Sequence, residues 1–343
     1  VTFDGLSRDQ NGKPIENGSP SFVDTGTGVA SQVGSLNSDP QKDIPGFGQG
    51  GDIEIKAHSL NLKNGAALSN ITYGGESFNP DGTIIYKNAG NITINADDAV
   101  NLTNGGQLRS DTFGIGNAGN ITVNGENAKV TFDGVSSGIQ SDVQPLKASI
   151  QNFTGNRKAG NITVNAREFS LTGAVLSSST SGIGNAGNIS IQAKTGTVSL
   201  NDAQVLSTVE SGAKGSAGII SIESKSIELN DNTELQTVIR ASEQNGATGN
   251  GGVILISATD SISLNNSGIF GTIEQGATVS DKLPLNPIIE SIYDNLDDDL
   301  KNFIAPRSGF ILLQAKKIEL KKGSSINSST FGLGDAGSII IDA

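Results

Sequence analysis

Two aspartates, Asp111 and Asp142, occupy equivalent positions in neighbouring repeats of this sequence, each three residues after an apolar position. Stacking of the repeats would bring the two carboxyl groups close together. Clustered carboxylates in a groove perform general acid–base chemistry, including cleavage of polysaccharides. The next repeats offer Ser179 and then Val209 at this position. The pair therefore does not extend into a catalytic set, and we expect no enzymatic activity.

A second acidic group consists of four aspartates, Asp294, Asp297, Asp298 and Asp299. Calcium takes about six to eight oxygen ligands, which several carboxylates in a loop can supply. Here, however, the aspartates would lie on a helix and point in different directions, and neither an EF-hand spacing nor a glycine-rich calcium nonapeptide is present. A solvated helix face is the favoured interpretation. His58 is the only histidine, so we predict no metal site built on it and no cofactor.

Any site in this chain must be positioned by a repeated unit, because one phrase recurs along the sequence. The shortest spacings between its copies are 27 to 29 residues. Within each copy, apolar residues alternate with polar ones, which indicates a strand because successive side chains point to opposite faces. The copies are GDIEIKA at 51, GNITINA at 90, GNITVNG at 119, GNITVNA at 160, GNISIQA at 187, GIISIES at 218, GVILISA at 252, GFILLQA at 309 and GSIIIDA at 337.

Two further apolar segments follow the phrase in each repeat. The second segment carries pairs such as Val100/Leu102 and Val198/Leu200. The third segment carries one inward residue: Leu68, Leu108, Ile139, Leu176, Leu206, Leu235 and Ile326. A small polar residue follows two positions later: Asn70, Ser110, Ser141, Ser178, Thr208, Thr237 and Ser328. Because buried hydroxyl groups need partners, we predict that these residues form a column hydrogen-bonded along the stack.

Three short strands per unit cannot bury an apolar face alone, but they can if each pairs in parallel with its copy one repeat later. We therefore predict an all-β fold, a parallel β-helix (solenoid) of about nine coils with three short strands per coil. Right-handed winding is expected because parallel crossovers prefer it. A βαβ protein would need a connection of about a dozen residues between strands, for which the shortest units have no room. Residues 1–343 are expected to form one domain.

Asparagine follows the glycine of the phrase in four consecutive repeats, at Asn91, Asn120, Asn161 and Asn188. Asparagine tolerates turn conformations and carries both a donor and an acceptor. We predict that the four side chains stack as a hydrogen-bonded ladder at one corner of the coil; simple exposure to solvent is the alternative.

Insertions lengthen several repeats, mostly after the third strand, and are expected to lie on one edge of the rod. They fall near 8–30, 35–48, 74–88, 142–157, 240–250 and 274–308. The largest contains Asn286-Pro287, a typical helix start, followed by apolar residues at helical spacing. We predict a helix near 287–304 that packs on the side of the β-helix. The insertions are either tolerated loops or a binding face.

The formal net charge of −12 argues against a nucleic-acid partner, because phosphates favour a basic surface. No run of apolar residues approaches the roughly 18 needed to cross a bilayer, so membrane insertion is not predicted. The chain has no cysteine, which excludes a disulfide framework.

The phrase Gly-Asn-Ala-Gly-Asn followed by alternating apolar residues occurs before Val123 and Ile191 and is echoed before Ile341. It resembles the repeat of cyanobacterial filamentous-haemagglutinin-like exoproteins, which are exported by two-partner secretion. The resemblance covers nearly the whole chain and implies a right-handed β-helix, secretion to the cell surface, an outer-membrane secretion partner and an adhesin function. The Asn-Pro-Asn motifs of the family's secretion module are absent. We therefore expect an internal segment of a longer protein.

These observations together predict a secreted, extracellular adhesin segment without enzymatic activity. A rigid rod would present its insertion loops for multivalent attachment to surfaces or glycans. The alternatives are a structural stalk or a self-assembling filament segment, because the two ends are complementary in phase and could associate end to end. A polysaccharide lyase or hydrolase on a β-helix is a less favoured alternative.

Overall fold

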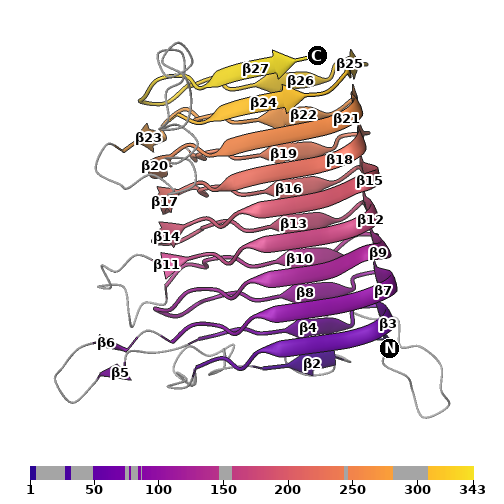
Figure 1. Cartoon of the computed structure of the whole chain (residues 1–343). Helices are drawn as coiled ribbons and strands as arrows, with labels where there is room; N and C mark the ends of the chain where they lie inside the picture. The colour runs from indigo at the N-terminus through magenta and orange to yellow at the C-terminus, as the bar shows by residue number, and fades with distance from the viewer. Residues whose placement is uncertain are drawn as a thin grey trace.

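The computed structural model describes residues 1–4, 28–31, 49–73, 77–78, 84–85, 87–146, 157–242, 246–280 and 308–343. These residues are all-β, and no helix occurs among them. Repeats stack one above another from the N-terminal to the C-terminal strand, as Figure 1 shows. The predicted parallel β-helix is confirmed. The predicted helix near 287–304 and the aspartates from Asp294 to Asp299 lie outside the described residues.

The first sheet contains 11 strands, and all of its pairings are parallel. Its strands are β1 (Thr2–Asp4), β3 (Ile53–Lys63), β7 (Ile92–Thr103), β9 (Ile121–Asp133), β12 (Ile162–Thr172), β15 (Ile189–Asn201), β18 (Ile219–Asn230), β21 (Val253–Asn265), β24 (Phe310–Gln314), β25 (Lys317–Lys321) and β27 (Ser338–Asp342). From β3 to β21, the two segments expected as separate short strands form one long strand. The pairing register shifts near its middle, for example between Asn95 and Ala99, and each half keeps its own alternation.

The second sheet contains nine strands; the first of them precedes the copy of the phrase at 51, and the last copy, at 337, contributes none. They are β2 (Gly28–Ala30), β4 (Ala67–Ser69), β8 (Gln107–Arg109), β10 (Gly138–Gln140), β13 (Val175–Ser177), β16 (Gln204–Leu206), β19 (Glu234–Gln236), β22 (Gly268–Phe270) and β26 (Ser325–Asn327). Tight turns join the long strands to this sheet. Asn104 and Gly105 have φ angles of 50° and 83° there, a region that asparagine and glycine tolerate best.

A third side carries short strands that the sequence pattern did not predict. β11 (Arg157–Lys158) pairs with β14 (Gly184–Asn185), and β17 (Lys214–Ser216), β20 (Thr248–Asn250) and β23 (Thr278–Val279) form another small sheet. These strands have only two or three residues, and β14, β17 and β20 contain glycine, so they show no apolar alternation. The insertion after Tyr73 includes an antiparallel pair, β5 (Ser77–Phe78) with β6 (Ile84–Ile85).

The long strands run from left to right across the near side in Figure 1, and the chain returns behind them as it climbs. The winding is therefore right-handed. The gaps after Tyr73, Leu146, Ser242 and Ser280 all fall between the second-sheet strand of one coil and the first-sheet strand of the next. The insertion near 8–30 differs. Because β1 pairs with the end of β3 and β2 pairs with β4, this insertion replaces the turn between the first two sheets.

Columns of apolar side chains fill the interior. In β7, Ile92, Ile94, Val100 and Leu102 are fully buried, and their partners in β9 are buried equally. The outward residues between them are partly exposed. Burial of each such side chain contributes about 1.5–3 kcal/mol, so the core accounts for the rigidity of the stack.

One predicted core position is wrong by a single residue. Val205, not Leu206, pairs with Leu176 and Leu235 in the second sheet. Val205 is fully buried, whereas Leu206 is only half-buried and points outward. Two adjacent apolar residues satisfy the alternation equally well, and pairing with the neighbouring coils decides the register.

Candidate functional site

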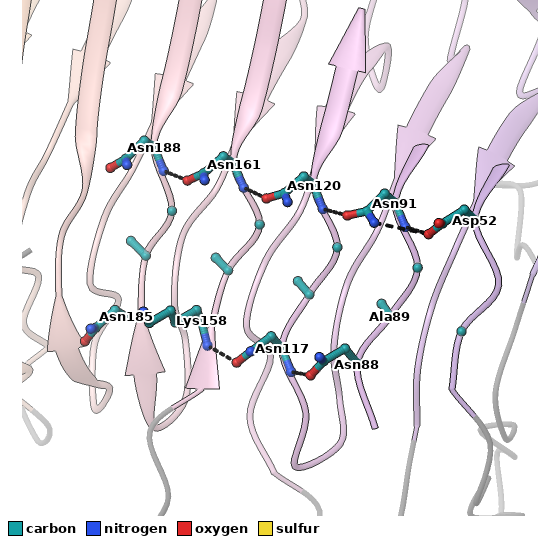
Figure 2. A pocket seen from close by; sticks show the side chains of 18 of the residues that line it. Asp52, Asn88, Ala89, Asn91, Asn117, Asn120, Lys158, Asn161, Asn185 and Asn188 are labelled. Atoms are coloured by element: carbon teal, nitrogen blue, oxygen red, sulfur yellow. Dashed lines mark hydrogen bonds between the residues drawn. The ribbon is translucent and has the colours of Figure 1, made fainter. Parts of the chain in front are cut away.

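The predicted asparagine ladder forms where each coil enters its long strand (Figure 2). The backbone N–H of Asn120 donates to Oδ1 of Asn91 at 2.9 Å, and that of Asn161 donates to Oδ1 of Asn120 at 2.8 Å. Asn188 N–H donates to Asn161 in the same way at 2.9 Å. Asp52 begins the row and accepts from Asn91 N–H at 2.7 Å. The side-chain oxygen of each coil thus binds the backbone of the next.

A second row of amides runs beside the first, three residues earlier in each coil. Oδ1 of Asn88 accepts from Asn117 N–H at 2.8 Å, and Oδ1 of Asn117 accepts from Lys158 N–H at 2.9 Å. Oδ1 of Asn185 accepts from Ser216 N–H at 3.0 Å. The two rows enclose a groove of about 620 Å³. We call this region the asparagine corner; its floor consists of Ala89, Ala118, Ala159, Ala186 and Ala217.

The predicted column of small polar residues links successive glycines of the corner. Ser110 Oγ donates to Gly90 O at 2.8 Å and accepts from Gly119 N–H at 3.0 Å. Ser141 repeats this arrangement one coil later, and Ser178 Oγ donates to Gly160 O.

The one-residue shift of β16 changes one member of this column. Ser207, not Thr208, occupies the position: its Oγ donates to Gly187 O at 2.7 Å and accepts from Gly218 N–H at 2.9 Å. Thr237 lies in the column as predicted, but its buried hydroxyl has no hydrogen-bond partner. Thr208 points outward, where it joins a different group of residues.

That group, which we call the polar face, follows the outer side of the second sheet and the positions just after it. Its members are Arg109, Asp111, Asp142, Ser177, Ser179, Ser181, Thr208, Glu210 and Arg240. Arg109 Nε donates to Asp111 Oδ2 at 3.1 Å, and Asp142 N–H donates to Asp111 Oδ1 at 2.9 Å. The two aspartates therefore lie in adjacent coils, as their spacing predicted. The ion pair with Arg109 was not predicted.

Asp142 is buried and accepts three hydrogen bonds. Ser179 N–H and Ser177 Oγ donate to its Oδ1 at 2.7 and 2.8 Å, and Gln140 Nε2 donates to its Oδ2 at 2.7 Å. Burial, reinforced by the charge of Asp111, nevertheless raises the pKa of Asp142 to about 7. Burial also raises the pKa of Asp111, but Arg109 opposes that shift. The proton of the pair therefore belongs on Asp142.

The polar face continues over the next coils. Thr208 Oγ1 lies 2.9 Å from Ser179 Oγ and also donates to Glu210. Arg240 Nε donates to Glu210 Oε1 at 3.1 Å, and its Nη1 lies 3.5 Å from Glu274 Oε1. The sequence predicted Val209 at the position that is equivalent to Ser179 in the next coil. The shifted register places Thr208 there instead, so the polar positions extend further than predicted.

Two adjoining cavities open on the polar face. One of about 440 Å³ is lined by Asp142, Ser179, Ser181, Glu210 and Arg240, among others. The other, of about 330 Å³, lies over β8, β10 and β13. Ser177 and Leu206 line both cavities. Near Arg109, the rings of Tyr73 and Phe113 stack with centroids 5.0 Å apart. Acids, hydroxyls, guanidinium groups and an aromatic pair thus lie along one face of the stack.

Arg157, at the base of the insertion that starts near 142, is fully buried. Its Nε donates to Ile183 O at 2.8 Å and its Nη1 to Gly114 O at 3.0 Å. Burial lowers its pKa to about 10. Because these contacts reach the coils on either side, Arg157 fastens three coils together.

Of the remaining sequence candidates, the aspartates from Asp294 to Asp299 lie outside the described residues and His58 lies within them. His58 is exposed in β3, and its Nε2 lies 3.9 Å from Asp98 Oδ2. Within the described ranges, no group of acidic and histidine side chains could hold a metal ion. The same ranges contain no helix that could span a bilayer.

Comparisons with protein-family models, with curated proteins and with solved structures find nothing that matches this chain.

Proposed function

We propose that this chain is a rigid β-helical rod of a secreted cell-surface exoprotein that attaches to glycans through its polar face. The observation that supports the proposal is the break in the repeat along this face. At one position of the coil, neighbouring repeats supply Asp142, Ser179 and Thr208, where a purely structural stack needs only similar residues. Non-repeating polar groups that share a cavity are typical of binding sites.

Glycans fit the chemistry of the polar face. Sugar hydroxyls both donate and accept hydrogen bonds, and the face offers carboxylates, hydroxyls and guanidinium groups for both roles. The stacked pair of Tyr73 and Phe113 adds a flat apolar surface. A polyanionic ligand is less suitable, because the chain carries a net charge of −12 and the two arginines of the face are already paired with acids.

Attachment would gain strength from the rod. Modest contacts at several positions of one elongated molecule combine through effective concentration. Export by two-partner secretion and an outer-membrane secretion partner belong to the same proposal and are supported by the resemblance of the repeats. We propose binding without cleavage, so the polysaccharide would keep its length.

The proposal is tested by measuring binding of the purified chain to a panel of immobilised glycans. We expect Glu210→Gln to weaken binding about tenfold, because one charged hydrogen-bonding group of the cavity is lost. Glu228→Gln is the matched control, since Glu228 is exposed on the first sheet. Equal binding by both variants would reject the polar face as the binding site. No binding by the parent chain would instead indicate that the chain serves as a structural spacer. Shortening of a bound polysaccharide would instead indicate an enzyme.

A further inference from the structure

At the asparagine corner, several side-chain amide nitrogens take no part in the hydrogen bonds that join the coils. In each ladder bond the side-chain oxygen accepts a backbone N–H, so the oxygen is engaged while the amide nitrogen points elsewhere. The amide nitrogens of Asn117, Asn120 and Asn161 have no hydrogen-bond acceptor among the described residues. Asn117 and Asn120 lie in one coil and Asn161 in the next, so three amide nitrogens from two adjacent coils are left available (Figure 2).

These donors line a long and narrow space. The groove is built from six successive coils, within 49–52, 88–91, 117–120, 158–161, 185–188 and 216–217. At about 4.8 Å per coil, it extends roughly 24 Å along the stack. Its alanine floor is apolar, and its charged lining residues are one acid, Asp52, and one base, Lys158. A ligand that fills it must be elongated and needs no net charge.

We propose that the groove binds a linear neutral polysaccharide lying along the stack, with its oxygens accepting from the two rows of amides. The inference rests on the proposed attachment to glycans and adds a second site to the polar face. Because each amide is fixed by its ladder bond, binding would order few side chains. A repeating array of donors matches a ligand whose own acceptors repeat, and the alanine floor accommodates the C–H faces of sugar rings.

Other elongated ligands fit less well. An added peptide strand pairs with a free edge of backbone donors and acceptors, whereas the backbone N–H groups of Asn91, Asn120, Asn161 and Asn188 are all engaged within the stack. Nucleic acid is disfavoured by the net charge of −12.

The chain itself suggests a variant that removes donors but keeps the ladder. Asp52 occupies the ladder position in the first coil, and its Oδ1 accepts from Asn91 N–H at 2.7 Å. Aspartate therefore supports the stack without offering an amide nitrogen. The double variant Asn117→Asp with Asn161→Asp would remove one donor from each row while both acceptor oxygens remain. Gln192→Glu with Gln204→Glu is the control, because it adds the same charge outside the groove.

The experiment measures binding of the intact chain to three soluble neutral polymers, hydroxyethylcellulose, a linear mannan and arabinoxylan, by affinity electrophoresis. We expect at least one polymer to bind, and we expect the Asn117/Asn161 variant to lose about tenfold in affinity. The control should keep that affinity, and equal unfolding midpoints should show that every variant folds. Unchanged binding by the Asn117/Asn161 variant would overturn the proposal that the groove binds the polysaccharide, without affecting the proposal for the polar face. Failure of all glycans to bind would overturn both proposals.

Discussion

The asparagine corner and the polar face are built by the same coils but differ in what each coil contributes. At the corner, successive coils supply the same side chain, and its oxygen holds the next coil. On the polar face, successive coils supply Asp111, Asp142, Ser179 and Thr208 at one position. The corner therefore presents an array, whereas the face presents a set of unlike groups at fixed places.

This difference separates two ways in which a stacked fold carries function. An array suits a ligand that repeats with the stack, and any one member of it contributes little. A set of unlike groups suits one local ligand feature, and each member matters because no neighbour can replace it. The effects of substitutions in the two regions should therefore differ in magnitude and in pH dependence.

The largest effect is expected on the polar face when the pH changes. The pKa of Asp142 in the folded chain is raised to about 7, well above that of an unfolded aspartate. The folded state then holds an extra proton between about pH 4 and pH 7. The free energy of unfolding is therefore greatest below about pH 4, decreases as the pH rises from 4 to 7, and levels off above 7. The loss should be on the order of 4 kcal/mol over that window, at about 1.4 kcal/mol per pH unit.

Asp142→Asn should flatten this slope, because asparagine carries no charge to bury. At pH 8 the variant should unfold at higher temperature than the parent, and at pH 4 the difference should be small. Unfolding midpoints between pH 4 and pH 8 give the comparison, with Glu228→Gln as control. A parent chain that is as stable at pH 8 as at pH 5 would show that burial does not hold the proton on Asp142.

The next effect is expected at the corner, where coils approach too closely for a side chain. A Cβ added at Gly160 would lie 1.9 Å from Gly119 O, a backbone atom that cannot move without its coil. Gly160→Ala should destabilise the stack by about 3 kcal/mol. Gly271→Ala is the control, since its nearest neighbour would be a side-chain atom at 3.5 Å. Similar urea midpoints for the two variants would contradict this account of the corner.

The same contrast explains what the sequence could and could not predict. The corner and the core were predictable because identical residues recur in register, from Asn91 to Asn188. The small strands of the third side were not, because two or three residues are too few to show an alternation of apolar and polar side chains. The register of β16 was ambiguous, since Val205 and Leu206 are both apolar. Because of that one-residue error, Thr208 was not assigned to the polar face. The hydrogen-bonded connection from Asp142 through Ser179 and Thr208 to Glu210 was therefore not predicted.

Two members of the buried polar column that joins the two regions differ in their hydrogen bonding. Ser207 satisfies Gly187 O and Gly218 N–H, so Ser207→Ala should leave two buried backbone groups unpaired and cost about 2 kcal/mol. Thr237 occupies the equivalent place, but its hydroxyl is unpartnered. Thr237→Val should therefore be neutral or slightly stabilising. Thermal unfolding of both variants measures the sign, and equal losses would show that the column acts by packing alone.

The smallest effect is expected from a single rung of the ladder. Asn161→Ala removes the acceptor for Asn188 N–H, but the corner is open to water, which replaces the lost bond. The cost should be about 0.5 kcal/mol. Asn161→Asp keeps the acceptor and should leave the unfolding midpoint unchanged, as Asp52 does in the first coil. If alanine and aspartate were equally destabilising, the side-chain oxygen would not be what holds adjacent coils together. A single rung should thus matter little to stability, because its neighbours in the array keep the coils aligned.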